Sequence, residues 1–496
     1  MGLIWSTDDS VIFVGGRGTK AGDENAGGGC TASFWGDLKN PSKSLSDVMG
    51  TNGEPVSAAI AWGGVANSCN VSQSTAGKLL ITKAGAFTNV SAGLIANVNF
   101  AGVYSDGRYR VNSAQLTDDT IEIELTYSSG TTCDVKVGGA FDKLQTALDN
   151  TTADQVAYHN VNILTNKAET FSGAGDRIDV DVGGGYGYSG IWKRIIGVDD
   201  NGVELAVGSY VAYDGNSQDC HVFYINNINN IEFRHIYAKD AGTNCNGFSV
   251  EATVASKGFS FIYCSSSGCK HGIYAGNYNA YMIYIEGGYY SSSESWAVYT
   301  YQARYVTAKE VEFFGATTTP LINAYCSGHF VLDGCILRKT AGYSAGIIGN
   351  YPTALVLVKN CVFYNIDNCI ELNDNDAKLI QYNNIFVLHT AETGKIIKRT
   401  KGSIVYSDYS CAWAIDGAPS ASDRWGGTGL PEHAIEQNPQ FVGVDNDDVR
   451  PRNKNVLRGG RPDIADNATQ MGAVLQEYQF VRRAKSANLS RLQIIR

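Results

Sequence analysis

One short pattern returns about every 25 residues between Ile231 and Lys398. An apolar position flanked by Gly, Asn or Ala recurs at Phe248, Ile273, Val298, Ile322, Ile347, Ile370 and Ile396. A second position keeps the same period at Ile236, Cys264, Gly287, Val311, Cys335, Cys361 and Asn384. Two positions that share one period predict a repeat array, in which each repeat stacks on the next and buries a continuous core.

The length of the repeat restricts what it can contain. About 25 residues are too few for a strand and a full helix, but they suit two or three short strands that turn corners. Many repeats open with an apolar pair spaced by one residue, such as Phe330/Leu332 and Val356/Val358. The chain of 496 residues holds 56 Gly, 28 Tyr and only 9 Pro, which favours strands joined by tight turns. We therefore expect an all-β fold, a parallel β-helix over residues 141–400.

The segments before the array differ from it in composition and in residue pattern. Residues 1–74 are Gly-rich and predict an irregular attachment segment with one strand at 10–14. Residues 75–140 alternate at strand period between turn signals, which predicts a small antiparallel β module. Residues 141–148 have helical apolar spacing, and a short helix there would cap the open end of the array. The start of the chain lacks the basic and apolar regions of a secretory signal, and the Met favours folding in a cytoplasm over a removed signal.

After the array the period dissolves. Residues 401–477 predict an irregular closing segment, and residues 478–496 a basic tail that either docks on a neighbouring chain or is solvated. The twelve cysteines show no CxxC pairing, and several fall at inward repeat positions, so we expect reduced thiols acting as small apolar side chains. Cys335 and Cys361 share a column of neighbouring repeats, which leaves a bridge sterically conceivable.

Charge and hydropathy argue against two classes of partner. The net charge is −10, whereas nucleic-acid binding usually needs a basic patch or stripe. No apolar run approaches the ~20 residues needed to span a bilayer. The sequence therefore predicts neither a nucleic-acid partner nor a membrane partner.

A predicted outward column changes character along the array. It consists of Glu232, Ser260, Ile283, Thr307, Val331, Leu357 and Ile380. Its apolar members, Ile283, Val331, Leu357 and Ile380, form a stripe of the kind that marks a contact surface. The stripe has two possible explanations. It is either an interface with another chain or a surface covered by the protein's own C-terminal segment.

Aromatic residues crowd the middle of the array. Tyr274 and Tyr299 occupy one outward column in adjacent repeats. Others nearby are Tyr281, Tyr284, Tyr289, Tyr290, Trp296 and Tyr301. Because Tyr and Trp combine an apolar body with a polar group, such a ladder suits a glycan, a trimer contact or simple surface packing. We favour a trimer contact or simple surface packing.

Several motifs resemble the right-handed parallel β-helix (pectate-lyase-like) superfamily over residues 141–476. They are the strand at 359–363 (KNCVF), the coil at 367–372 (DNCIEL), and the closing stretches at 406–409, 438–442, 447–450 and 471–473. The module around residues 87–93 and 137–141 is similar to modules of bacteriophage and environmental-bacterial β-helix proteins. The resemblance implies a right-handed β-helix that serves as a structural surface protein of a phage particle, either a head decoration (cement) protein or a tail spike.

Such a protein would be a homotrimer that contacts other virion proteins, with a surface polysaccharide as a further partner. It would be made in the host cytoplasm and reside on the virion, the alternative being an extracellular location.

The same superfamily includes enzymes, which gives the alternative function of a polysaccharide lyase or glycoside hydrolase. A lyase needs carboxylates that hold Ca²⁺ and an Arg or Lys base, and a hydrolase needs two carboxylates ~5–9.5 Å apart. Candidate acids are Asp374 and Asp376 in a loop after a strand, and Glu310 and Glu312 on one predicted strand face.

The family's Gly-His-Gly and Arg-Ile-Lys signatures do not appear in the sequence. We therefore favour a solvated corner and a solvated strand face for these acids, a structural role for His271, and no cofactor, with Ca²⁺ implied only for a lyase.

Overall fold

The computed structural model describes residues 9–16, 26–38, 44–57, 68–151, 160–181, 192–226, 228, 230–251, 256–276, 280–292, 295–315, 319–340, 345–349, 355–417, 424–427, 429–443 and 448–458. The chain forms two compact units. The first comprises Met1–Glu169, Ile178–Leu205 and Asn229–Arg234, and the second comprises Thr170–Arg177, Ala206–Ile228 and His235–Arg496.

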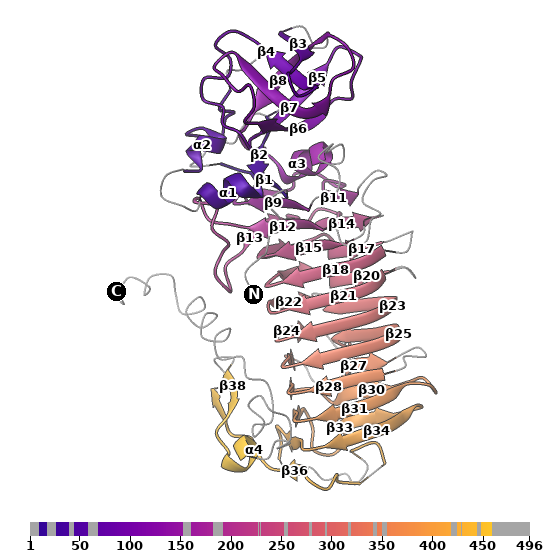
Figure 1. The fold of residues 1–496 in the computed structure, drawn as a ribbon. Helices are drawn as coiled ribbons and strands as arrows, with labels where there is room; N and C mark the ends of the chain where they lie inside the picture. The colour runs from indigo at the N-terminus through magenta and orange to yellow at the C-terminus, as the bar shows by residue number, and fades with distance from the viewer. Residues whose placement is uncertain are drawn as a thin grey trace, which may run out of the picture. The chain divides into compact units, whose positions relative to one another are not determined.

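The first unit contains a closed antiparallel barrel in the order β3-β4-β7-β6-β5-β8 (Figure 1). Its strands are β3 (Cys69–Gln73), β4 (Lys78–Thr82), β5 (Ile95–Phe100), β6 (Gly107–Asn112), β7 (Thr120–Thr126) and β8 (Thr131–Val137). Alternate residues such as Leu79, Ile81, Ile121 and Ile123 are buried inside it. The antiparallel module predicted from the alternation is confirmed, with its first strand starting at Cys69.

The first unit also holds strands of a parallel sheet. β9 (Val161–Thr165) lies between β1 (Ser10–Val14) and β12 (Lys193–Gly197), and β12 pairs in turn with β15 (Ile231–Arg234). The predicted strand at 10–14 thus belongs to the parallel sheet, and β2 (Gly29–Thr31) pairs with it antiparallel. Helix α3 (Leu144–Thr151) packs its buried Leu144, Ala147 and Leu148 near β1, β9 and β11 (Ile178–Asp181). Two shorter helices are α1 (Ala32–Leu38) and α2 (Ser46–Met49).

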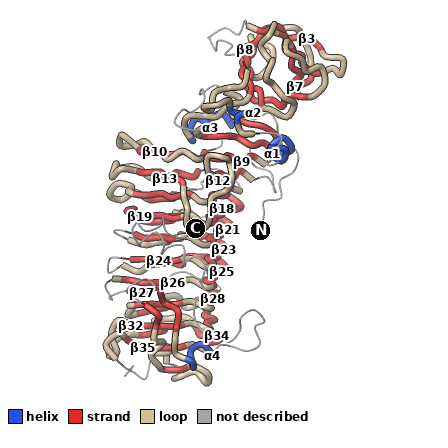
Figure 2. The backbone as a smooth tube through the Cα atoms, turned by 90° about the vertical axis from the view of Figure 1, so that its left-hand side faces the viewer, coloured by secondary structure: helices blue, strands red, loops and turns tan. Residues whose placement is uncertain are grey.

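The second unit is a parallel β-solenoid whose coils each visit three faces (Figures 1 and 2). Face A contains β14 (Phe223–Asn226), β17 (Asn246–Val250), β20 (His271–Ala275), the first halves of β23 (Val298–Lys309) and β25 (Ile322–Asp333), β27 (Ala345–Gly349), β30 (Asn368–Leu372) and β33 (Lys395–Arg399). Face B contains β18 (Ser256–Ile262), β21 (Ala280–Glu286), the second halves of β23 and β25, β28 (Leu355–Lys359), β31 (Lys378–Tyr382) and β34 (Ser403–Asp408).

Face C completes each coil. It contains β13 (Val211–Asp214), β16 (Ile236–Lys239), β19 (Ser265–Cys269), β22 (Tyr289–Ser292), β24 (Glu312–Gly315), β26 (Ile336–Lys339), β29 (Val362–Tyr364), β32 (Ile385–Leu388), β35 (Cys411–Ala414) and β36 (Ile435–Glu436). The predicted all-β solenoid of about 25-residue coils is confirmed.

The inward columns follow the repeat in the sequence, apart from two one-residue errors. From Phe248 to Ile370 the predicted positions pair coil by coil on face A and are buried. Ile370 then pairs with Ile397, not Ile396. In the second column, the pairing of Ser265 with Tyr289 places Gly288, not Gly287, beside Cys264. All twelve cysteines are buried and none forms a disulfide, as predicted, and burial raises the pKa of the Cys361 thiol well above its ordinary value.

The corner between faces B and C uses one left-handed residue per coil. These residues are His235, Tyr263, Gly287, Glu310, Gly334, Asn360, Asn383 and Tyr409, with φ between 48° and 66°. In successive coils the N–H of this residue donates to a carbonyl of the next coil, as Glu310 does to Asp333 at 2.8 Å. The corner therefore turns the chain and continues the ladder of hydrogen bonds between coils.

The described part of the C-terminal segment packs on face C. Val449 and Val456, the latter in helix α4 (Lys454–Arg458), join a buried cluster with Ile336, Val362 and Ile385. The other strands of this segment are β37 (Phe441–Gly443) and β38 (Asp448–Pro451), which pair antiparallel. Coverage by the protein's own C-terminal segment, one of the two interpretations of the apolar stripe, is thus seen on a different face from the one predicted.

Candidate binding faces

An apolar column runs along the outer side of face B. Register pairs place Val331, Leu357, Ile380 and Tyr406 on consecutive strands, after Tyr284 and Thr307. Val331, Leu357 and Ile380 are partly exposed. The prediction for Ile283 is wrong, because Ile283 pairs with Phe259 and Val306 inside the solenoid and is fully buried. Tyr284 takes the outward position.

Polar pairs border this column on one side, and further apolar groups lie on the other. The next outward positions hold Lys309 with Glu286 at 3.8 Å and Lys359 with Asp333 at 2.9 Å. On the opposite side Met282 is 40% exposed, and the rings of Tyr305 and His329 lie 5.6 Å apart. An apolar centre with a charged edge is the pattern of a protein interface.

The four candidate acids do not come together. Glu310 is the left-handed corner residue, and its exposed carboxylate lies 3.7 Å from Lys309. The prediction of one solvated face for Glu310 and Glu312 is wrong, because Glu312 is 4% exposed and accepts a hydrogen bond from Arg338 Nε at 2.6 Å. Glu312 is buried since its column continues into Ile336 and Val362, on which the closing segment packs.

Asp374 and Asp376 lie in the corner between β30 and β31. The N–H of Asp376 donates to Asp374 Oδ1 at 3.0 Å, so the first carboxylate closes a local turn. Asp376 is exposed. This corner joins faces A and B, whereas Glu310 occupies the corner between faces B and C. The arrangement gives Glu310, Glu312 and Asp374 local structural roles and leaves the Asp376 side chain exposed.

Replacing Glu310 by asparagine tests the corner role. Asn tolerates the left-handed region better than Glu, and Asn360 and Asn383 hold the same corner in later coils. We expect Glu310→Asn to stabilise the protein by about 0.5 kcal/mol in chemical denaturation. Asp376→Asn, at an exposed position with no such requirement, should leave stability unchanged. A loss of stability in Glu310→Asn would contradict the corner role.

Face A carries an aromatic column. Tyr274 and Tyr299 pair directly across β20 and β23, and their rings stack at 5.3 Å and 11°. The prediction that these two residues share an outward column in adjacent coils is confirmed. The column begins with Tyr224 and Ser249 and continues beyond Tyr299 with Asn323 and Ile348. Its last described members, Glu371 and Lys398, form an ion pair at 3.2 Å.

Two histidines support this column. His221 Nδ1 accepts the N–H of Asn246 at 3.0 Å, and His271 Nδ1 accepts the N–H of Trp296 at 3.3 Å, so each imidazole ties its coil to the next. Burial lowers the pKa of His271 to about 4 and also lowers the pKa of His221. Both rings are neutral at pH 7, and their Nδ1 atoms are occupied, which fits the structural role expected for His271.

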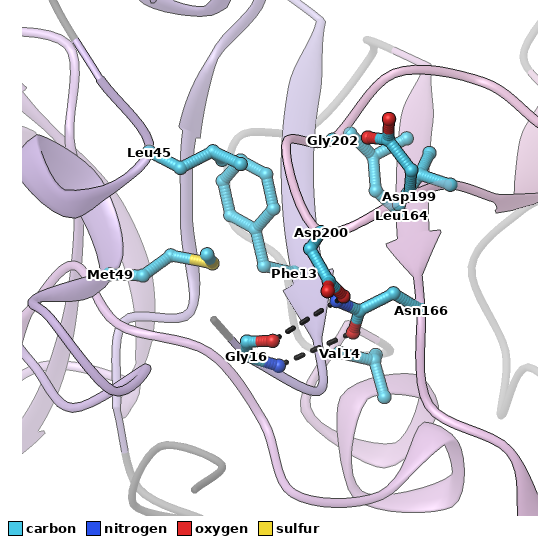
Figure 3. A pocket seen from close by; sticks show the side chains of 11 residues that line it. Phe13, Val14, Gly16, Leu45, Met49, Leu164, Asn166, Asp199, Asp200 and Gly202 are labelled. Carbon is cyan, nitrogen blue, oxygen red and sulfur yellow. Dashed lines mark hydrogen bonds between the residues drawn. The ribbon is translucent and has the colours of Figure 1, made fainter. Parts of the chain in front are cut away.

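A hollow in the first unit is too small for most ligands. Phe13, Leu45 and Met49 line one side and Leu164 lies across from them beside Asp199, while Asn166 binds the backbone of Gly16 and donates to Asp200 at 3.1 Å (Figure 3). Its empty volume is about 220 Å³, open solvent included. Small-molecule sites usually exceed about 300 Å³. This hollow therefore gives no basis for a ligand site.

Neither a metal cluster nor a membrane span emerges from the described ranges. Within them, no group of three or more His, Cys, Asp or Glu residues is placed to hold a metal ion. No described helix is long and apolar enough to cross a membrane. Comparisons with known protein families, curated proteins and solved structures found no match for this chain.

Proposed function

We propose that this chain is a structural surface protein of a bacteriophage particle, a head decoration protein or a tail spike, that self-associates as a trimer through face B. The observation that carries the proposal is the partly exposed column Val331, Leu357 and Ile380. A row of partly exposed apolar side chains on adjacent strands is the kind of surface that marks an interaction site.

Two features of the chain support this proposal over an enzyme. The candidate acids hold a corner, a buried ion pair with Arg338 and a local turn, which are structural tasks. In the described closing segment, Val449 and Val456 are buried against face C and therefore do not cover the apolar column of face B. The resemblance of the N-terminal module to phage β-helix proteins supports a location on the virion, in contact with other virion proteins.

Replacing Leu357 by aspartate tests the trimer. A carboxylate in the middle of an apolar interface would be desolvated without a partner, so the variant should be monomeric. Light scattering on the purified chain should give a trimer mass for the wild type and a monomer mass for Leu357→Asp. Ile415→Asp is the matched control, because Ile415 is 49% exposed and follows β35, a strand of face C. An unchanged mass in Leu357→Asp would exclude face B as the interface.

Electron microscopy of particles from the native source tests the location. Gold-labelled antibodies against the chain should mark heads or tails at regular positions. Label only on material outside particles would contradict a virion role and favour the extracellular alternative.

A further inference from the structure

We infer that the outer side of face A, from Asn226 to Tyr325, is a binding site for an extended neutral glycan. The site consists of aromatic rings beside amide, hydroxyl and carboxylate groups on successive coils. It lies on a different face from the proposed trimer contact and does not depend on it.

The aromatic part of this site is ordered by stacking between coils. Beside the Tyr274–Tyr299 pair, Trp296 meets the Tyr299 ring edge-on at 6.0 Å. In the next outward column Tyr301 and Tyr325 stack at 4.7 Å and 4°. All five side chains are partly exposed. Rings held in this way lose little freedom on binding and offer apolar surface with hydroxyl groups at the edge.

Gly276 shapes the surface beside Tyr274. A Cβ at Gly276 would lie 2.2 Å from Cε1 and 2.5 Å from the hydroxyl oxygen of Tyr274, so the tyrosine ring lies across this glycine. Any larger residue would displace the ring. The absence of a side chain at Gly276 thus allows the Tyr274 ring to lie over the strand.

Two amide oxygens in the neighbouring coils have no hydrogen-bond donor within the described structure. Asn246 is 4% exposed and its Oδ1 has no partner, while Asn226 Oδ1, one coil earlier on the same face, is also unsatisfied. Asn246 Nδ2 donates to Ser249 Oγ at 3.2 Å, and Ser249 donates to Glu251 Oε1 at 3.2 Å. A buried acceptor without a donor is costly, so these groups favour a ligand rich in hydroxyl donors.

The donors in the site are also built in. Because His221 and His271 accept backbone N–H groups through Nδ1, the proton of each neutral ring resides on Nε2, which can donate. At the first coil the Arg177 guanidinium lies 4.0 Å from the Tyr224 ring centre. Hydroxyl groups, which both donate and accept, match this mixture of donors and acceptors.

Charge selects a neutral ligand over an acidic one. Glu251 lies within the site beside Ser249, whereas the Arg177 guanidinium is confined to the first coil, and the chain as a whole carries −10. A uronate or phosphate polymer that follows several coils would meet repulsion from Glu251 and from the net charge of the chain. A polymer of neutral sugars has apolar ring faces for the tyrosines, hydroxyls for the amides, and repeating units that can follow a surface repeating at every coil.

Affinity electrophoresis of the full chain tests the site directly. Each gel would contain one neutral glycan, which is dextran, a mixed-linkage β-glucan, a galactomannan or soluble chitin oligomers. A gel with polygalacturonate provides the acidic comparison. We expect retardation by at least one neutral glycan and none by polygalacturonate. Tyr274→Ala should weaken the retention by about tenfold, because it removes a stacked ring from the centre of the site.

Gly276→Ala provides a second variant that keeps every aromatic side chain but displaces the Tyr274 ring, and it should weaken retention similarly. Ile415→Asp, at a 49% exposed position directly after β35 and several coils away from the site, should bind as the wild type does. Retention by polygalacturonate alone, retention by no neutral glycan, or wild-type retention in a folded Gly276→Ala protein would overturn the proposal. A loss of oligomer mass in Gly276→Ala would also overturn it, since face A would then be a contact between copies of the chain.

Discussion

Replacing Trp425 by alanine is expected to lower the free energy of unfolding by about 3–5 kcal/mol, the usual cost of removing a buried Trp. Trp425 is 2% exposed, and its indole meets the buried ring of Phe386 edge-on at 6.2 Å. The measurement is chemical denaturation followed by circular dichroism.

The reason for so large an effect is the position of Trp425 at the last coil of face A. It bridges to Ile397 in β33, and the N–H of Ile397 donates to the carbonyl of Arg424 at 2.9 Å. The fully buried Arg424 donates to the carbonyl of Ala391. Residues 424–427 therefore act as a cap that covers apolar interior and occupies the edge of β33, which a solenoid needs at its ends.

The loss of stability in Trp425→Ala should be confined at first to the last coils, because each coil interacts mainly with its neighbours. Hydrogen exchange in Trp425→Ala should rise in β33 and β32 before it rises in β17 and β20. Trp413→Ala is the matched control, since Trp413 is a partly exposed Trp on the outer side of β35 and should cost less than half as much. Equal losses in both variants, or uniform exchange along the solenoid, would contradict a capping role.

The period in the sequence was sufficient to predict the solenoid because inward positions tolerate few residue types. The two one-residue errors both occur where neighbours are alike, at Ile396/Ile397 and Gly287/Gly288. When two adjacent residues suit the same position, composition cannot choose between them. The hydrogen-bond register makes that choice, and it depends on contacts between coils that one repeat does not contain.

The error at Ile283 has a related cause. Residues 281–285 read Tyr-Met-Ile-Tyr-Ile, so every position is apolar and the alternation that separates inside from outside is absent. The structure buries Ile283 and Ile285, which places Tyr284 on the outer side of the strand. At Glu310 a signal was available, because Gly334, Asn360 and Asn383 fall at the same step of later coils and all favour a left-handed corner.

The candidate glycan site was only partly predictable. Tyr274 and Tyr299 stand out as large residues at one repeat position, and the structure stacks them. Asn246, Ser249 and Gly276 carry no comparable signal in the sequence, since small and amide residues are common at every corner of the chain. Their role depends on which coil lies beside which tyrosine, which is a property of the stack.

Asn384 is a polar residue of the core whose replacement should have a large effect on stability. It is fully buried; its Oδ1 accepts the N–H of Cys361 at 2.8 Å, and its Nδ2 donates to the carbonyl of Val358 at 3.0 Å and to Gln381 Oε1 at 2.9 Å. We expect Asn384→Leu to cost about 3 kcal/mol, because it removes the acceptor of the buried Cys361 N–H and a donor to the Val358 carbonyl and to Gln381 Oε1. Denaturant titration measures this loss.

Asn384→Asp separates hydrogen bonding from size, because the two side chains have nearly the same shape. One carboxylate oxygen can still accept from Cys361, but the other faces the Val358 carbonyl and Gln381 Oε1, which are acceptors. The neutral acid is then favoured in the folded chain, so its pKa should be raised and the stability deficit should grow as the pH increases above the unfolded value of about 4. Asn375→Asp, at an exposed corner, should show no such pH dependence. A deficit in Asn384→Asp that is independent of pH would mean that the buried network tolerates the charge, and that packing alone makes this position sensitive.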